Sequence, residues 1–267
     1  MATFGFIGTG NMGGALVKAV AKTVPPTDIM IANRTRAKAD ALAREVGCRV
    51  CHNADVCWSD FIFLGVKPAM IGGVIDEIRD DLTGRDRPAV LVSMAAAVSI
   101  DDIADMLGAD YPIIRIMPNT PVSVGEGVIL YTPNAQVSAR DEEEFVKALS
   151  FAGKCVKIEE KLMDPAGALS GCGPAFADLF MESLADGAVA CGVPRATAVE
   201  LAARTLMGSA KLLIESGKNP GQLKDEVCSP GGTTIAGVRV LEESAFRAAS
   251  MNAVIAAYDK TLALKKK

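Results

Sequence analysis

The amino-acid sequence predicts an α/β domain with a mainly parallel sheet, followed by an all-α domain. Three observations predict this architecture. Short apolar runs alternate with amphipathic segments over the first part of the chain, strand signals stop after about Lys161, and the remainder has helical periodicity. A chain of 267 residues is long enough for two moderate domains. We therefore expect an α/β domain at residues 1–160 and an α-helical domain at residues 161–267.

The expected strands of the first domain are short apolar runs bounded by turn-forming residues. They lie at residues 3–8, 29–32, 61–66, 89–93, 113–117 and 127–131. Between them, apolar residues recur at helical spacing at 12–22, 35–46, 69–79, 100–107 and 139–151. This alternation is typical of βαβ units, in which helices cover both faces of a parallel sheet.

The expected helices of the second domain carry apolar residues on several faces. Pro174 is suited to begin the first helix and Gly192 to end it, while Pro194 and Gly217 bound the second. Two more helices are expected at 234–243 and 244–264. Because these helices are rich in Ala and Gly, a single copy would expose more apolar surface than a monomer tolerates. We therefore expect a homodimer built on this domain.

Composition and charge exclude several classes of protein. Half of the residues are apolar and 22% are charged, which is a globular composition. The 28 basic and 32 acidic side chains leave a net charge of −4, which disfavours a nucleic-acid partner. No apolar run reaches the roughly 18 residues of a membrane span, and the start lacks the basic opening of a signal peptide. We expect a cytoplasmic protein with no membrane partner.

The cysteines and the single histidine argue against a metal site. Seven cysteines without an export signal are expected to be reduced thiols. The segment from Cys48 to His52 matches the C-x-x-C-H string that attaches haem c, but it falls where a strand and loop are expected. We interpret Cys48 and Cys51 as small buried hydrophobes. With one histidine, His-based triads and multi-His metal sites are hard to build, and we expect no metal.

A glycine-rich loop follows the first expected strand directly and precedes a helix. It reads Gly8-Thr9-Gly10-Asn11-Met12-Gly13, a G-x-G-x-x-G run in the context of a dinucleotide-binding, Rossmann-like domain. The glycines allow a tight turn, close approach of a pyrophosphate, and close packing of helix on strand. The alternative is an ordinary glycine-rich turn without a ligand.

The end of the second expected strand discriminates between cofactors. An NAD site usually places a carboxylate here to accept hydrogen bonds from the ribose hydroxyls, but the sequence reads Ala32-Asn33-Arg34-Thr35. Arg34 can pair with a 2′-phosphate, and Asn33 and Thr35 add neutral donors. NADPH is therefore the expected cofactor, with NADH weaker. In the alternative interpretation, Arg34 only begins a solvated helix.

A second glycine-rich loop lies in the helical domain. Ser229-Pro230-Gly231-Gly232-Thr233-Thr234 runs straight into a helix, so hydroxyl groups stand beside free N-terminal amides. Such an arrangement suits a carboxylate. The alternative is a simple capped turn between two helices.

Beyond these patterns, the chain resembles the pyrroline-5-carboxylate reductase family along essentially its whole length. The segments that carry the resemblance are residues 5–12, 66–68, 117–121, 169–175 and, above all, 229–234 with the flanking 223–225 and 241–242. The resemblance implies reduction of 1-pyrroline-5-carboxylate to L-proline by NADPH, the last step of proline synthesis, in a homodimer that could assemble further.

The resemblance also implies roles for individual residues. The pyrophosphate would be held by Ile7, Gly8, Thr9, Gly10, Asn11 and Met12, the 2′-phosphate by Asn33, Arg34 and Thr35, and the adenosine ribose region by Asn53. The ribose and nicotinamide would be lined by Gly65, Val66, Lys67, Pro68, Met94, Ala95 and Ala96. The substrate carboxylate would bind Gly232, Thr233 and Thr234, with the Thr234 hydroxyl near the ring nitrogen. Glu226 stands where some members have an amide, and Lys67 could equally contact the cofactor or cap its strand.

Two other functions are consistent with a dinucleotide domain followed by helices. A β-hydroxyacid dehydrogenase or ketopantoate-type reductase would place a catalytic lysine on the first long helix, yet none lies between Lys161 and Lys211. A non-catalytic NADP sensor would not need the second anion site. An iminium, by contrast, already carries the positive charge that attracts hydride, so its reduction needs no strong general acid.

Overall fold

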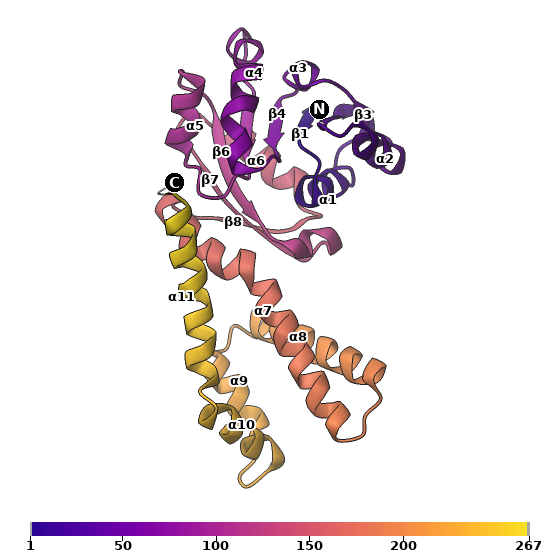
Figure 1. The fold of residues 1–267 in the computed structure, drawn as a ribbon, viewed down its shortest axis with the longest axis vertical. Coiled ribbons are helices and arrows are strands. Elements are labelled where there is room, and N and C mark those ends of the chain that lie inside the picture. Colours follow the sequence, from indigo (N-terminus) through magenta and orange to yellow (C-terminus); the bar gives the residue numbers. More distant parts are fainter. Residues whose placement is uncertain (1, 266–267) are drawn as a thin grey trace. The chain divides into compact units, whose positions relative to one another are not determined.

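The structure is a computed structural model that describes residues 2–265. It contains two compact units (Figure 1). The first comprises the chain up to Cys172 together with the segment that begins at Ala257. The second unit is Gly173–Ala256.

The first unit is built on one sheet, which within the described residues has eight strands in the order β3-β2-β1-β4-β5-β6-β7-β8. All neighbouring strands are parallel except β6 and β7. The predicted α/β architecture with a mainly parallel sheet is confirmed. The strands are β1 Phe4–Ile7, β2 Ile29–Ala32, β3 Arg49–Val50, β4 Phe61–Leu64, β5 Val90–Ser93, β6 Ile113–Pro118, β7 Gly127–Pro133 and β8 Gly153–Lys157.

Helices cover both faces of this sheet because strand residues alternate between two apolar cores. Phe6 and Phe63 stack at 4.6 Å between ring centroids in one core, against α1 and α6. Ile7 and Leu64 belong to the other core, against α4 and α5. The helices are α1 Asn11–Val20, α2 Arg36–Val46, α3 Asn53–Val56, α4 Ile71–Thr83, α5 Ile100–Leu107 and α6 Ala139–Ala148.

Strand β8 was not among the predicted strands. Its five residues, Gly-Lys-Cys-Val-Lys, contain only two apolar side chains, and none of its residues is fully buried. It forms a parallel pair with β7, in which Gly127 lies opposite Gly153. At Gly153, φ is +134°, and a Cβ would lie 2.0 Å from the Gly127 carbonyl oxygen, so only glycine fits.

The expectation that Pro174 begins a helix is wrong, because α7 runs from Met163 to Ala190 with Pro174 inside it. A proline there has no N–H for the carbonyl of Ser170, four residues earlier. The Asn119 side chain replaces the missing donor: its Nδ2 donates to the Ser170 oxygen at 3.0 Å. Asn119 Oδ1 accepts from the backbone N–H of Val128 at 2.9 Å. The buried side-chain amide of Asn119 therefore pairs with a backbone N–H of β7 and with the α7 carbonyl that Pro174 leaves without a donor.

A buried ion pair holds the first turn of α7 on the sheet. Arg115 of β6 is 1% exposed, and its Nη2 donates to Asp164 Oδ1 at 2.8 Å. Its Nη1 lies 3.3 Å from Glu160 Oε1, which also accepts from the backbone N–H of Ile100 at 2.8 Å. Removing one partner of such a group would leave an uncompensated buried charge. The arginine therefore fixes where the long helix starts.

The second unit is helical, as predicted, and has a small core. Its helices, drawn in salmon to yellow in Figure 1, are the part of α7 from Gly173 on, α8 Arg195–Ser216, α9 Pro220–Val227, α10 Thr233–Glu243, and the part of α11 (Phe246–Lys265) up to Ala256. Ala185, Ala198 and Ala202 form its buried apolar cluster. Larger apolar side chains are exposed, among them Leu179, Leu201, Met207, Leu212 and Ile214. Many large apolar side chains of these helices are therefore not covered by the rest of the chain.

The Asn119 bridge can be tested by a double-mutant cycle. Asn119→Ala leaves a buried N–H and a buried carbonyl unpaired, so we expect the free energy of unfolding to fall by about 2 to 4 kcal/mol. In the Pro174→Ala background, alanine restores the backbone donor to Ser170, and the cost of Asn119→Ala should fall by about 1 kcal/mol. Denaturant unfolding at fixed protein concentration measures both values.

A matched control is Asn134→Ala. Asn134 also bridges two backbone groups, since it accepts from Ile113 N–H at 3.1 Å and donates to the Tyr111 oxygen at 2.8 Å. Its cost should not depend on residue 174. Equal costs of Asn119→Ala in both backgrounds would refute the proposed replacement of the helical donor.

Candidate functional site

Three glycines bring the ends of β1 and β4 and the start of α1 closer than any side chain would allow. Gly8 has a φ of +93°, and its N–H donates to the Ala32 oxygen at 2.8 Å. A Cβ at either Gly13 or Gly65 would lie 2.3 Å from the Gly8 carbonyl oxygen, a distance that backbone cannot relieve. These contacts explain two of the glycines in the G-x-G-x-x-G run and add Gly65, which the pattern does not contain.

Gly10 differs from these three. A Cβ built on Gly10 would have no described atom within 4 Å, and its φ of −67° is open to any residue. The fold itself therefore does not require glycine at this position. Gly10 caps α1 and lines a cavity, so a side chain would only occupy the space where an anion can reach the free amides of the first turn. This is the arrangement that a pyrophosphate needs.

That cavity, which we call the cofactor cavity, has a volume of about 1090 Å³ and lies wholly in the first unit. It contains most of the residues predicted to bind a cofactor. Those that line it are Ile7, Gly8, Gly10, Asn11, Met12, Asn33, Arg34, Thr35, Asn53, Gly65, Val66, Lys67, Pro68, Met94 and Ala96. Residues far apart in the chain are thus gathered at the carboxyl ends of the parallel strands.

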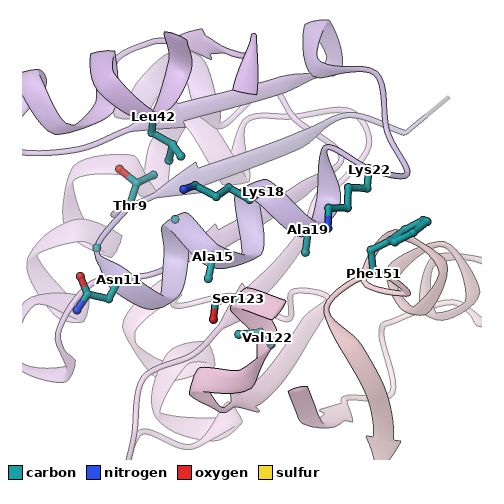
Figure 2. A pocket seen from close by; sticks show the side chains of 12 residues that line it. Thr9, Asn11, Ala15, Lys18, Ala19, Lys22, Leu42, Val122, Ser123 and Phe151 are labelled. Atoms are coloured by element: carbon teal, nitrogen blue, oxygen red, sulfur yellow. The ribbon is translucent and has the colours of Figure 1, made fainter. Parts of the chain in front are cut away.

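Thr9 and Ala95 are not among the lining residues. Ala95 is 1% exposed and belongs to the core behind the cavity. Thr9 is 7% exposed and borders a smaller hollow of about 410 Å³ beside α1. Figure 2 shows this hollow, with Lys18 on α1 and Lys22, just after the end of α1, beside Phe151. Neither side chain therefore lines the cofactor cavity, and the role of Thr9 and Ala95 in cofactor binding stays a prediction.

Asn33 acts as a bridge between two loops of the cavity. Its Oδ1 accepts from the backbone N–H of Thr9 at 3.1 Å, and its Nδ2 donates to the Thr35 oxygen at 3.0 Å. The amide thus ties the glycine loop to the turn after β2. This commitment reduces what Asn33 can offer to a phosphate and leaves Arg34 as the main group for that role.

The end of the cavity near β2 is basic. Arg34 is exposed and makes no ion pair within residues 2–265, whereas Arg36 lies 3.3 Å from Asp40. Lys38 lines the same end, and Glu77 is the one carboxylate among the described lining residues. The charge at this end therefore favours a 2′-phosphate over a bare ribose hydroxyl.

The predicted cofactor-binding residues do not include several lining residues, namely Gly13, Ala32, Arg36, Lys38, Cys51, His52, Met70, Val74, Glu77, Met117 and Pro118. The basic residues were detectable, because they alternate with Arg34 just after the second strand. Glu77 was not, since it lies on α4 and reaches the cavity only through the fold. There Glu77 Oε2 accepts from Asn53 Nδ2 at 2.9 Å.

The two thiols of the C-x-x-C-H string are poor metal ligands. Burial raises the pKa of the Cys48 thiol, and burial together with the nearby Asp55 carboxylate raises the pKa of the Cys51 thiol. Both shifts disfavour the thiolate, which is the form of cysteine that binds a metal. In the described part of the chain, no three His, Cys, Asp or Glu side chains are grouped so that they could hold a metal.

The loop predicted to bind the substrate lies in the second unit and offers a free helix N-terminus. Gly231 has a φ of +69°, and the Gly232 N–H donates to the Ser229 oxygen at 3.0 Å, which closes the turn. Gly232 caps α10 with extended backbone, and no described side chain accepts from its first-turn amides. Thr233 and Thr234 are exposed. The amides and the Thr234 hydroxyl are therefore available to a small anion.

Glu226 and Lys67 are now placed as well. Glu226 Oε1 lies 2.7 Å from Lys218 Nζ, and both side chains are about half exposed. Lys67 lines the cofactor cavity and precedes a 3₁₀ turn at Pro68–Met70. Its ammonium makes no ion pair with a described residue, so it can meet a phosphate or ribose oxygen.

No helix in residues 2–265 is long and apolar enough to cross a membrane.

Comparison with known proteins identifies the family. Residues 160–264 match the family model for pyrroline-5-carboxylate reductase dimerisation, and residues 3–97 match that for coenzyme F420-dependent NADP oxidoreductase. The pyrroline-5-carboxylate reductase of Escherichia coli K12 is 41% identical over 98% of both chains. That of Arabidopsis thaliana is 39% identical over 95% of this chain and 92% of its own.

Solved structures agree with these relatives over the whole length. The Plasmodium falciparum pyrroline carboxylate reductase with NADP bound is 32% identical, covers 99% of this chain and 98% of its own, and has a TM-score of 0.88. The Coxiella burnetii pyrroline-5-carboxylate reductase is 31% identical, with coverages of 100% and 99% and a TM-score of 0.91. The chain therefore belongs to the pyrroline-5-carboxylate reductase family.

Proposed function

We propose that the protein reduces 1-pyrroline-5-carboxylate to L-proline with NADPH, the last step of proline synthesis. The observation that carries this proposal is that one chain offers two places suited to an anion. One is the cofactor cavity with its glycine loop, and the other is the free N-terminus of α10. The relatives that share its full length carry the name of this activity.

The residues of the cofactor cavity fit NADPH. The amides that follow Gly10 at the start of α1 would hold the pyrophosphate, and Arg34 would pair with the 2′-phosphate. Met94, Ala96 and Lys67 would border the ribose and nicotinamide. When bound, the cofactor supplies a hydride. The solved Plasmodium falciparum relative has NADP bound, which supports this choice.

The α10 loop fits the substrate carboxylate. The amides of Gly232, Thr233 and Thr234 would bind it, and the Thr234 hydroxyl would lie at the ring nitrogen. Hydride adds to C5 of the protonated imine, the C=N π electrons move to nitrogen, and the ring becomes a neutral secondary amine. Thr234 then needs only to hold a hydrogen bond at that nitrogen while its charge changes.

This mechanism agrees with the residues that the chain lacks. A carbonyl reductase must protonate an alkoxide, usually through His, Lys or Tyr. Within the chain, His52 lines the adenosine end of the cofactor cavity, and no lysine lies between Lys161 and Lys211. An iminium needs neither group, so the residue inventory favours imine reduction over hydroxyacid oxidation.

We also propose that residues 161–267 form a homodimerisation domain distinct from a cofactor domain at 1–160. A family model for dimerisation that covers residues 160–264 supports this division. The exposed apolar residues of α7 to α11, such as Met207 and Ile214, support burial against a second copy. Since all seven cysteines within residues 2–265 are free thiols, we propose the reducing cytoplasm as the compartment.

The activity is tested by following NADPH oxidation with 1-pyrroline-5-carboxylate beside a panel of 2-keto and 3-hydroxy acids. We expect turnover with the cyclic imine alone. Thr234→Ala should lower kcat by about 10-fold or more, since it removes the hydrogen bond at nitrogen, while Thr234→Ser keeps the hydroxyl and should retain most activity. Reduction of a keto acid instead would overturn the substrate, and unchanged kcat in Thr234→Ala would remove Thr234 from the mechanism.

Arg34→Ala tests the cofactor assignment. Loss of a charge-assisted contact should weaken NADPH binding by about 1 to 3 kcal/mol and leave NADH nearly unchanged, because only NADPH carries the 2′-phosphate. Calorimetric titration of both nucleotides measures this difference. Arg44→Ala, further along α2 and outside the cavity, removes the same charge and serves as the control. Equal losses for the two nucleotides would contradict the role of Arg34.

The dimer proposal predicts a mass twice that of the 27.8 kDa chain, or a multiple of that dimer, by sedimentation at micromolar concentration. Met207→Glu on α8 should weaken the assembly, because it places a charge on an apolar face. Val124→Glu is a matched control, since Val124 is 74% exposed but lies in the cofactor domain. A monomeric wild-type protein under these conditions would refute the proposal.

A further inference from the structure

The Asn53 side chain of the cofactor cavity has a partner on a different helix. Asn53 begins α3, whose start is fixed by a hydrogen bond from the His52 N–H to Asp55 Oδ2 at 3.0 Å. Val56 of the same turn is fully buried, so the turn is anchored in the core. Asn53 Nδ2 donates to Glu77 Oε2 at 2.9 Å, across 24 positions of the chain.

Glu77 is held at the cavity by the packing of α4. Val74, Ile75 and Ile78 are buried, which fixes the rotation of the helix. Val74 and Glu77 are one turn apart and both line the cavity. The carboxylate therefore reaches Asn53 from a rigid element and not from a loop.

The bond to Glu77 decides which end of the Asn53 amide is free. An asparagine amide has one acceptor oxygen and one donor NH₂ group, and an ionised carboxylate can only accept. Glu77 therefore engages Nδ2, and no hydrogen bond within the described residues occupies Oδ1. Asn53 is left to present an acceptor to whatever lies in the cavity.

We propose that Glu77 is a positioning residue for the cofactor, which orients Asn53 so that Oδ1 accepts a hydrogen bond from the adenosine ribose. In a nucleotide with a 2′-phosphate, the 3′-hydroxyl is the remaining donor on that ribose. This inference rests on the proposed cofactor site. It also accounts for a carboxylate in a cavity that binds phosphates, because Glu77 acts through the neutral Asn53 side chain.

Electrostatics alone would have the opposite effect, which makes the proposal easy to test. A negative charge that shares a cavity with Arg34, Arg36 and Lys38 repels the phosphates of the cofactor, so its removal would tighten binding. Removal of a positioning residue would instead weaken binding, because Asn53 could turn its NH₂ group toward the ribose. The sign of the change separates the two effects.

The test measures the Kd of NADPH by calorimetry without substrate, so no turnover is needed. Glu77→Ala should raise the Kd by about 3- to 10-fold, as expected for one hydrogen bond. Glu77→Gln should give a smaller rise, because its amide can still accept from Asn53 but no longer enforces one orientation. Asp76→Ala removes a charge from the same helix outside the cavity and should leave the Kd unchanged.

Two further measurements separate positioning from a general structural effect. In the Asn53→Ala background, Glu77→Ala should cause no further loss, because the residue through which it acts is gone. The Kd of 2′,5′-ADP, which carries the adenosine half alone, should rise by the same factor as that of NADPH, whereas the Kd of nicotinamide mononucleotide should not. The melting temperature of the unliganded protein should not change, because Glu77 is exposed.

An unchanged or lower Kd in Glu77→Ala, or losses that add in the double variant, would overturn the proposal. The Arg34→Ala variant distinguishes this failure from failure of the proposed function. If Arg34→Ala weakens NADPH binding and Glu77→Ala does not, only the role of Glu77 falls. If neither variant affects binding, both the proposed cofactor site and the proposed role of Glu77 are refuted.

Discussion

The structure depends on the close approach of three backbone segments at Gly8, Gly13 and Gly65. The Gly8 carbonyl oxygen stands 2.3 Å from the place where a Cβ at Gly13 or Gly65 would be. This packing brings the end of β1, the start of α1 and the end of β4 together, and it shapes the floor of the cofactor cavity. The free backbone N–H groups at the start of α1 can then face a ligand, because Gly10 has no side chain that would cover them.

The fold and much of the site could be predicted because their signals are local. The glycine run, the missing carboxylate after Ala32 and the loop before Thr233 are each read within a few residues. What could not be predicted depends on partners distant in the chain. Pro174 sits inside α7 because Asn119 satisfies Ser170, and Glu77 lines the cavity because the packing of α4 fixes its direction. Neither contact can be recognised from the spacing of residues in the sequence.

Two physical tasks are divided between the units of the chain. The first unit has two apolar cores and a buried Arg115–Asp164 pair, so it can hold a rigid cavity of defined charge. The second unit buries mainly small residues and exposes large apolar ones, which suits a surface completed by another copy. Its free amides at Thr233 and Thr234 are the site that we propose for a small anion. In the proposed reaction, the first unit holds the cofactor and the second unit holds the imine.

The central claim is that the glycine loop serves a ligand as well as the fold, and Gly10→Ala tests it most directly. No described atom lies within 4 Å of a Cβ at Gly10, so the variant should unfold at the same denaturant concentration as wild type. The added methyl group would occupy the space of the pyrophosphate, so the Kd of NADPH should rise about 10-fold or more. Equal stability with unchanged NADPH affinity would contradict the account.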